Sequence, residues 1–231
     1  MVGDSHALFF GGTRRPVSFP LGGGSTGIRE GAGLIHPFKV FHLGPILAYN
    51  LCKYHSSMLG REKVDALRKY RFIPPKARVL CVFGEIDIRV HVFRQAERQN
   101  VAVEKIIDGI LENYRQFLCV LKKTNPVMVW GPIASVKDGG FCDSIWPYYG
   151  SEQERNKATE YCNRELEALC RVHGFEFVSI FKHLVDKDYH TKSSYYVDGY
   201  HLAQNAWDIA GAEFERRGIK IARHGISTGM K

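Results

Sequence analysis

The sequence has no apolar run that reaches the roughly 18 residues needed to span a membrane. Its first motif begins at residue 3, so we expect no secretory leader either. Six cysteines are present, but they form no Cys-x-x-Cys pair and no framework spacing, which is typical of reduced thiols. These absences predict a cytoplasmic protein without a membrane span or a disulfide framework.

Signatures of cofactor and nucleic-acid binding are missing as well. The glycine-rich stretch at 22–27 lacks the Gly-Lys-Ser/Thr ending of a phosphate loop, and the ten histidines show no metal-ligand spacing. We therefore expect no metal and no cofactor. The net charge of +8 favours anionic partners, but the basic residues are dispersed and no nucleic-acid motif accompanies them. We interpret them as a solvated surface and expect no nucleic-acid partner, while an anionic glycan or an acyl carrier stays open.

What the sequence does contain is an alternation of buried strands and amphipathic helices. Its 231 residues, 45% of them hydrophobic, suit a single domain over residues 1–231. Strands are predicted at 38–43, 78–83, 127–130 and 175–181, and helices at 46–58, 60–70, 101–123, 151–172 and 202–217. This alternation predicts a three-layer α/β/α fold with a mainly parallel sheet, which binds ligands at the carboxyl ends of its strands.

Two segments do not follow the alternation. Residues 11–36 contain eight glycines and are predicted to form a loop. Residues 134–150 form a second predicted loop, which carries Trp146, Tyr148 and Tyr149. These aromatic residues either stack on a sugar ring or pack against the domain.

The two ends of the chain carry the parts of a hydrolytic triad. Gly3-Asp4-Ser5 follows a short apolar start, and such a tight turn is a good place for a nucleophilic serine because it exposes the hydroxyl, although Gly-Asp-Ser is also a common turn former. Asp198-x-x-His201 can supply a base and the carboxylate that orients it, and Asp198 or a neighbour can cap the predicted helix at 202–217, instead of this role or in addition to it. About 190 residues separate the serine from the other two, so the fold must bring both ends of the chain together.

A third motif lies between these ends. Gly84-Glu85-Ile86-Asp87 follows a predicted buried strand, where a catalytic loop belongs. Taken in order, Gly3-Asp4-Ser5, Gly44, Gly84–Asp87 and Asp198-x-x-His201 resemble the four blocks of the SGNH (GDSL-like) hydrolase superfamily. The resemblance covers almost the whole chain and implies a flavodoxin-like α/β/α fold.

The resemblance also implies roles for individual residues. Ser5 would be the nucleophile, His201 the general base and then acid, and Asp198 the residue that orients His201. The backbone N–H groups of Ser5 and Gly44 would form two parts of the oxyanion hole. Members of the superfamily cleave carboxylic esters, including acetyl groups on glycans, and some are acyltransferases.

The chain departs from the superfamily pattern at two points. Ile86 stands where the pattern has its oxyanion-hole asparagine, and isoleucine cannot donate a hydrogen bond. Only Met1 and Val2 precede Gly3, so the first strand is predicted to be truncated, and we hypothesise that the native chain starts further upstream. The variant third block looks similar to a subset of the superfamily found near bacterial polysaccharide-synthesis proteins.

Charged residues next to this third block are candidates for substrate binding. Arg89 and His91 can replace the missing donor or hold an anionic substrate. Glu85 and Asp87 are the other two candidates for substrate binding. Alternatively, Glu85, Asp87 and Arg89 form an ion-pair network that braces the loop. For His6, packing on the first helix is favoured over a place beside the nucleophile.

The sequence therefore predicts a serine esterase or acyltransferase that acts on a small-molecule or glycan ester, and the favoured substrate is an O-acyl group of a carbohydrate. The alternative is a catalytically weak or inactive protein of the same fold that binds glycans or assists polysaccharide assembly. The sequence does not predict the oligomeric state.

Overall fold

The computed structural model describes residues 1–11, 17–19, 28–32, 38–139 and 147–219. A seven-stranded sheet runs through it in the order β2-β3-β4-β1-β5-β6-β7. The last five strands of this order are parallel, whereas β2 and β3 pair antiparallel at one edge. The strands are β1 (Val2–Gly3), β2 (Val17–Phe19), β3 (Ile28–Ala32), β4 (Lys39–His42), β5 (Val79–Val82), β6 (Val127–Trp130) and β7 (Glu176–Val178).

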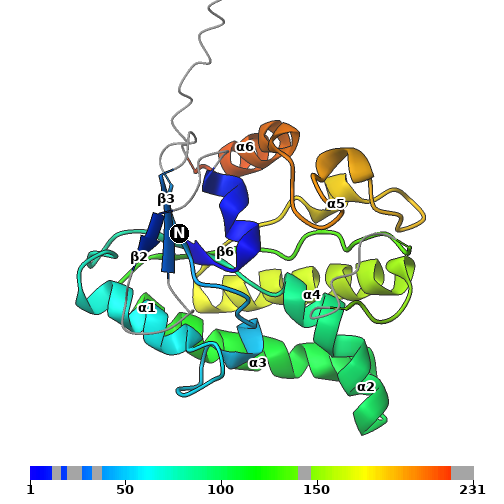
Figure 1. Ribbon diagram of the computed structural model, residues 1–231, viewed down its shortest axis with the longest axis horizontal. Coiled ribbons are helices and arrows are strands. Elements are labelled where there is room, and N and C mark those ends of the chain that lie inside the picture. Colours follow the sequence, from blue (N-terminus) through cyan, green and yellow to red (C-terminus); the bar gives the residue numbers. More distant parts are fainter. Residues whose placement is uncertain (12–16, 20–27, 33–37, 140–146, 220–231) are drawn as a thin grey trace, which may run out of the picture.

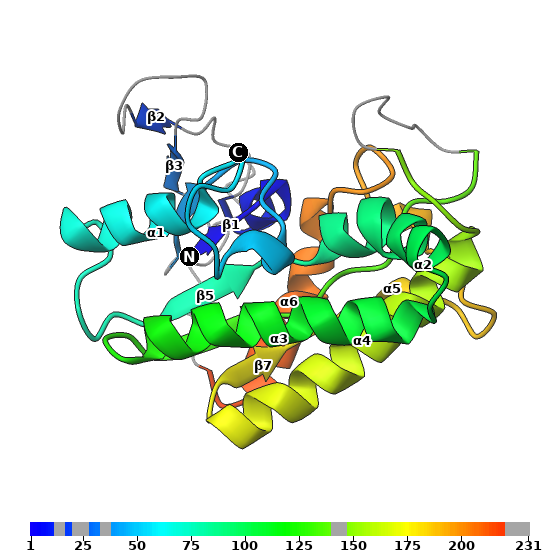
Figure 2. The ribbon, with the colours of Figure 1, turned by 90° about the horizontal axis from the view of Figure 1, so that it is seen from below.

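Helices cover both faces of the sheet, as Figures 1 and 2 show. In Figure 1, α1, α3 and α4 lie below the sheet, and α5, α6 and the first 3-10 helix lie above it. The bounds are α1 (Gly60–Lys69), α2 (Phe93–Gln99), α3 (Val103–Lys122), α4 (Glu152–His173), α5 (Phe181–Leu184) and α6 (Trp207–Arg216). Shorter helical turns are η1 (Ser5–Gly11), η2 (Ala48–Asn50), η3 (Asp87–Val92, a π-helix), η4 (Ser193–Tyr195) and η5 (Gln204–Ala206). This arrangement confirms the predicted three-layer α/β/α fold with a mainly parallel sheet.

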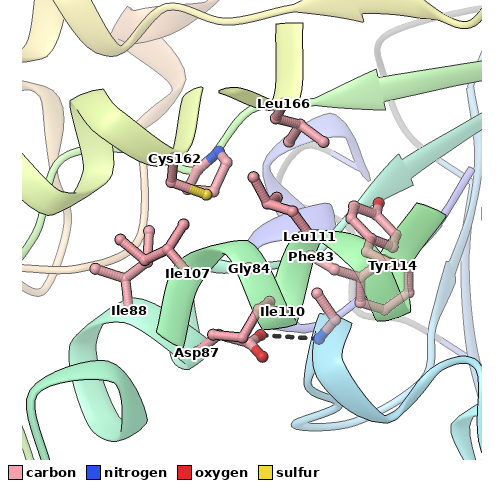
Figure 3. Close-up of a pocket in the computed structure, with 12 residues that line it drawn as sticks. Phe83, Gly84, Asp87, Ile88, Ile107, Ile110, Leu111, Tyr114, Cys162 and Leu166 are labelled. Atoms are coloured by element: carbon pink, nitrogen blue, oxygen red, sulfur yellow. Dashed lines mark hydrogen bonds between the residues drawn. The ribbon is translucent and has the colours of Figure 1, made fainter. Parts of the chain in front are cut away.

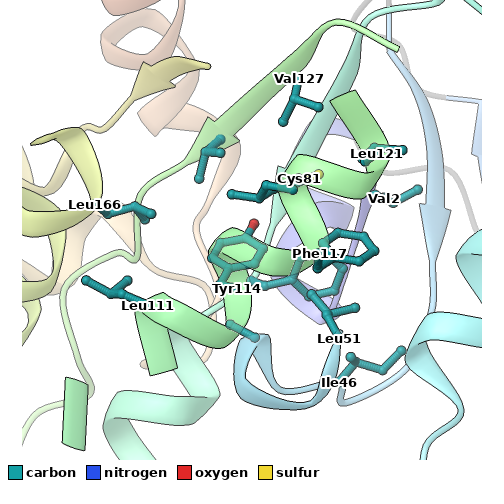
Figure 4. Packing of buried hydrophobic residues seen from close by; sticks show 14 of the residues in the cluster. Val2, Ile46, Leu51, Cys81, Leu111, Tyr114, Phe117, Leu121, Val127 and Leu166 are labelled. Atoms are coloured by element: carbon teal, nitrogen blue, oxygen red, sulfur yellow. The ribbon is translucent and has the colours of Figure 1, made fainter. Parts of the chain in front are cut away.

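The central strands are apolar on both sides, so each face of the sheet has its own core. Cys81 of β5 and Val129 of β6 pack with side chains of α1, α3 and α4, among them Tyr114 and Phe117 (Figure 4). Residues that alternate with these, such as Trp130, pack with the aromatic side chains of η1 and α6. This alternation follows from the two-residue period of a strand and explains the continuous apolar runs in the sequence.

The first strand is short, as predicted, yet it lies at the centre of the sheet. Its two residues pair in parallel with β4 on one side and with β5 on the other, so that Val2 faces Phe41 and Cys81. The N-terminal strand therefore fixes the residues after Gly3 between the ends of two neighbouring strands.

The predicted helix at 46–58 is wrong. Only the 3-10 turn η2 forms there. The reason lies elsewhere in the chain: the Asp87 carboxylate accepts the backbone N–H groups of Ala48 at 2.8 Å and Tyr49 at 3.1 Å. This tertiary anchor gives the segment hydrogen bonds that do not require a continuous helix.

Other boundaries also differ from the prediction. The segment 11–36, predicted as a loop, contains β2 and β3, and its residues 12–16, 20–27 and 33–36 lie outside the described residues. The last helix begins at Trp207 rather than at 202, because the Ala203 N–H donates to the Tyr195 carbonyl. By contrast, α4 matches its prediction, and Ser151 and Glu154 form a capping box at its start.

Two further findings concern the described part of the chain. None of its helices combines the length and apolar character needed to cross a membrane. Among the same residues, no three His, Cys, Asp or Glu side chains group in a way that could hold a metal ion.

Candidate active site

Three loops meet at one edge of the sheet because β4, β1 and β5 are parallel neighbours in register. Gly3 pairs with His42 on one side and with Val82 on the other. The residues that follow these strands, at 4–6, 43–50 and 83–87, therefore leave the sheet side by side. This is the edge at which open α/β sheets bind their ligands.

Ser5 begins η1, and only Asp4 separates it from the two-residue strand β1. Its neighbours Asp4 and His6 are buried, but Ser5 is partly exposed. The turn is held by the Asp4 carboxylate, which accepts the His6 backbone N–H at 2.9 Å, and by the Asp4 N–H, which donates to the Val82 carbonyl at 3.2 Å. These bonds direct the Ser5 side chain away from the core.

A chain of hydrogen bonds connects Ser5 with the C-terminal motif. His201 Nε2 lies 2.8 Å from the Ser5 hydroxyl oxygen, and His201 Nδ1 lies 2.6 Å from Asp198 Oδ2. The other Asp198 oxygen accepts the backbone N–H groups of Tyr200 and His201. Asp198 does not cap α6, whose N-cap is Ala206, so the capping alternative is excluded.

The charge states in this chain suit proton transfer from Ser5. Burial lowers the pKa of His201, and the neighbouring His6 lowers it further, although Asp198 opposes both. For Asp198, burial favours protonation, but the hydrogen bonds from His201 outweigh it and lower the pKa of the carboxyl. At neutral pH His201 is thus neutral and can accept a proton, while Asp198 is ionised and orients it.

Gly44, shortly after β4, has a φ of +93°, a backbone conformation that residues with a side chain rarely adopt. The carbonyl before it, on Leu43, accepts a hydrogen bond from Lys63 Nζ at 2.5 Å, which holds the peptide between them in place. Ile86 of the third loop is buried, with 4% of its surface exposed, and its side chain supplies no donor.

The four predicted substrate-binding residues fall into two groups. Glu85 and Arg89 form a buried ion pair, with Arg89 Nε 2.6 Å from Glu85 Oε1. Asp87 instead anchors the 48–49 turn, and burial raises the pKa of its carboxyl to about 7. His91 is half-buried and lines, with Asp87, a groove of about 460 Å³ beside α2 and α3. The structure brings only Glu85 and Arg89 to the side of the site where His201 lies.

A small cavity of about 10 Å³ lies behind the third loop (Figure 3). It is lined by Phe83, Gly84 and Asp87 and by side chains of α3 and α4, including Tyr114 and Cys162. A space of this size holds at most one water molecule. It therefore belongs to the packing beneath the loop, and no substrate fits there.

Two residues next to His201 were not among the predicted site residues. The His6 and His201 ring centroids are 5.1 Å apart, and the Tyr200 and His201 centroids are 4.5 Å apart. For His6 the favoured expectation was simple packing, yet His6 Nε2 bonds to Glu85 Oε2 at 2.9 Å. The available sequence signal was adjacency, since His6 follows Ser5 and Tyr200 precedes His201.

Tyr148 and Tyr149 of the 134–150 segment pack against other parts of the protein. The Arg155 guanidinium lies 4.4 Å from the Tyr148 ring centroid, and the Arg94 guanidinium lies 6.0 Å from that of Tyr149. The Tyr149 N–H donates to the Arg89 carbonyl at 3.2 Å. Trp146 lies outside the described residues.

Comparison with known proteins identifies the class of fold. No protein-family model and no curated protein sequence matches the chain. Several solved structures do, and the SGNH/GDSL-like hydrolase fold is common to them and to this chain.

The chain is similar to an acetylxylan esterase from Geobacillus stearothermophilus, with 14% identity, a TM-score of 0.52, and coverage of 97% of this chain and 95% of that one. It is also similar to a GDSL-like lipase from Bacteroides thetaiotaomicron, with 15% identity, a TM-score of 0.50, and coverage of 77% and 74%. A Streptococcus pneumoniae protein matches with 15% identity, a TM-score of 0.56, and coverage of 93% and 80%.

Proposed function

We propose that this protein is a serine esterase or acyltransferase that acts on an O-acyl ester of a carbohydrate. The observation that carries the proposal is the hydrogen-bonded chain from Ser5 through His201 to Asp198. It contains a nucleophile, a base and an orienting carboxylate in the order that acyl transfer requires. The similarity to an acetylxylan esterase supports an acetylated glycan as substrate.

In the proposed mechanism, the Ser5 oxygen attacks the ester carbonyl as His201 Nε2 takes the hydroxyl proton. The backbone N–H groups of Ser5 and Gly44 stabilise the resulting oxyanion. The C–O bond to the sugar then breaks, His201 gives its proton to the departing alkoxide, and an acyl-Ser5 ester remains. Water, or the hydroxyl of an acceptor, attacks this ester with His201 again as base.

The charged residues near the third loop have a different part in this proposal. Burial of the Glu85–Arg89 pair favours the bracing role over direct substrate contact, because two hydrogen bonds already join the two side chains. His91 lines an open groove and stays a candidate for substrate contact.

Replacement of the nucleophile tests the proposal. We expect Ser5→Ala to lower the turnover of p-nitrophenyl acetate and of acetylated xylooligosaccharides by at least about 10⁴-fold with an unchanged melting temperature. Ser193→Ala, at an exposed serine of η4, is the matched control and should retain full turnover. Undiminished turnover in Ser5→Ala would exclude this mechanism.

A second candidate function is a glycan-binding protein with little or no catalysis. Ile86 favours it, because the site lacks the side-chain donor of the superfamily pattern, and the loss of one such donor typically costs about 10²–10³ in turnover. Labelling with a fluorophosphonate distinguishes the two functions. Modification of Ser5 supports the enzyme, whereas saccharide binding without modification supports the binding protein.

A further inference from the structure

His201 is one member of a closed ring of contacts between side chains, whose other members are His6, Glu85, Arg89 and Tyr200. His6 packs against the His201 ring at 5.1 Å, and its Nε2 bonds to Glu85 at 2.9 Å. Glu85 in turn accepts two hydrogen bonds from the Arg89 guanidinium, at 2.6 and 3.2 Å. The guanidinium lies 5.2 Å from the Tyr200 ring centroid, and Tyr200 packs against His201 at 4.5 Å, which closes the ring.

This ring differs from a surface ion pair because its charged members are buried. His6, Glu85 and Arg89 are exposed by only 6%, 5% and 7%. Charged groups in such a setting are costly unless each is paired, and here one carboxylate serves two cations. The two neighbouring cations therefore stabilise the ionised form of Glu85, and its carboxylate holds both His6 and Arg89 in place.

The groups that face His6 decide its charge. Burial alone disfavours a protonated His6, but the carboxylates of Glu85 and Asp4 outweigh it and raise the pKa of the imidazole, with Arg89 opposing them. Burial raises the pKa of Asp4 to about 6, so at neutral pH it also carries a charge. His6 is accordingly a cation under conditions in which His201 is neutral.

The groups that face His201 come from three parts of the chain. Asp198 and Tyr200 belong to its own loop, His6 to η1 and Glu85 to the third loop. Of these, the His6 cation opposes protonation of His201, whereas Asp198 and Glu85 favour it.

On the basis of the proposed function, we propose that His6 is a positioning residue of the triad: Glu85, fixed by Arg89, holds the His6 cation against the His201 ring and keeps His201 available as a base. These contacts orient the His201 imidazole toward Ser5, and the positive charge of His6 disfavours protonation of His201 by solvent, so that His201 is neutral when it takes the proton from Ser5. The sites of attack and of proton transfer do not involve His6 itself.

The change His6→Gln separates the charge from the hydrogen bond. The glutamine amide can still donate to Glu85, so a merely structural role would be preserved. Removal of a charge about 5 Å from His201 should raise the pH at which His201 loses its proton by about one unit. The acid limb of the profile of kcat/KM against pH should shift by that amount, with the alkaline plateau retained to within about tenfold.

The kinetic test uses p-nitrophenyl acetate and the full-length protein. His183→Gln is the matched control, because this exposed histidine of α5 lies outside the site, and it should leave the acid limb in place. An acid limb in His6→Gln that coincides with that of the unchanged protein would overturn the proposal.

A second measurement does not depend on turnover. Nuclear magnetic resonance of ¹⁵N-histidine-labelled protein follows the ionisation of each ring, with His201 assigned through His201→Gln. We expect His6 to keep its proton to a higher pH than His201. Loss of the His6 proton before that of His201 would overturn the proposal, whatever the esterase assay shows, whereas absence of turnover in the unchanged protein would count only against the proposed function.

Discussion

Gly3 is a position at which one added methyl group would test the geometry of both the sheet and the site. A Cβ atom built there would lie 2.6 Å from the Val82 carbonyl oxygen and 2.8 Å from the Cβ atoms of Val82 and Ala7. The carbonyl oxygen belongs to the backbone of β5, and a Cβ atom is bonded directly to the backbone, so none of these atoms can move away by rotation of a side chain. The change Gly3→Ala must therefore move β1 or η1.

The size of the effect follows from these distances. The closest contact is about 0.8 Å shorter than the 3.4 Å at which ordinary contacts begin. Overpacking of this kind costs about 1–3 kcal/mol, and the two-residue strand β1 between two partners leaves little room for relaxation. We expect the free energy of unfolding to fall by about 3 kcal/mol.

The same displacement should reach Ser5, two residues further on. A catalytic group misplaced by about 1 Å costs about 10²-fold in rate, so kcat/KM of Gly3→Ala should fall by that factor. Urea unfolding followed by circular dichroism gives the stability, and hydrolysis of p-nitrophenyl acetate gives the rate.

Gly109→Ala is the matched control for this experiment. Gly109 lies inside α3, and nothing lies within 4 Å of a Cβ atom built there. Alanine should stabilise the helix by about 0.5–1 kcal/mol and leave the rate unchanged. If Gly3→Ala unfolds within about 0.5 kcal/mol of the unchanged protein, the inferred packing of β1 against β5 is incorrect.

Two further predictions concern charged groups. Asp198→Asn should lower kcat by about 10⁴-fold, because the amide disfavours the His201 tautomer that accepts the Ser5 proton in the proposed mechanism. Urea unfolding of this variant should show little loss of stability. A kcat within tenfold of that of the unchanged protein would contradict the proposed role of Asp198. The free energy of unfolding should fall as pH rises from about 4 to 7, because burial raises the pKa of Asp87 to about 7 and the native state therefore holds a proton that the unfolded chain has released. Urea titrations across this range should show a loss of a few kcal/mol, and stability that rises instead would contradict the burial argument.

The predictions that succeeded rest on neighbouring residues. The continuous apolar run at 78–83 indicated a buried strand, and β5 occupies Val79–Val82. Ser151 and Glu154, three residues apart, indicated the start of α4, where the capping box forms. In each case the residues that determine the structure are close together in the sequence, so the local pattern was sufficient to predict it.

The segment 46–58 shows where this approach ends. Its residues are compatible with a helix, but the Asp87 carboxylate binds the N–H groups of Ala48 and Tyr49 from 39 and 38 positions away. No local pattern records that bond. The roles of Glu85, Asp87 and Arg89 were ambiguous for the same reason, because each depends on which side of the third loop a side chain faces.

The candidate site combines both kinds of information. Gly3-Asp4-Ser5 and Asp198-x-x-His201 were candidates from residue type and short spacing, and the resemblance of all four motifs to one superfamily gave them their predicted roles. The alternation of strands and helices between them was enough to predict a fold that joins the chain ends. The hydrogen bond between Ser5 and His201, which are 196 positions apart, arises only in three dimensions. The same is true of the ring of contacts that includes His201, because it depends on the bond between His6 and Glu85, 79 positions apart. The packing of parallel strands and of the loops that follow them sets these contacts, since it determines which buried charges meet.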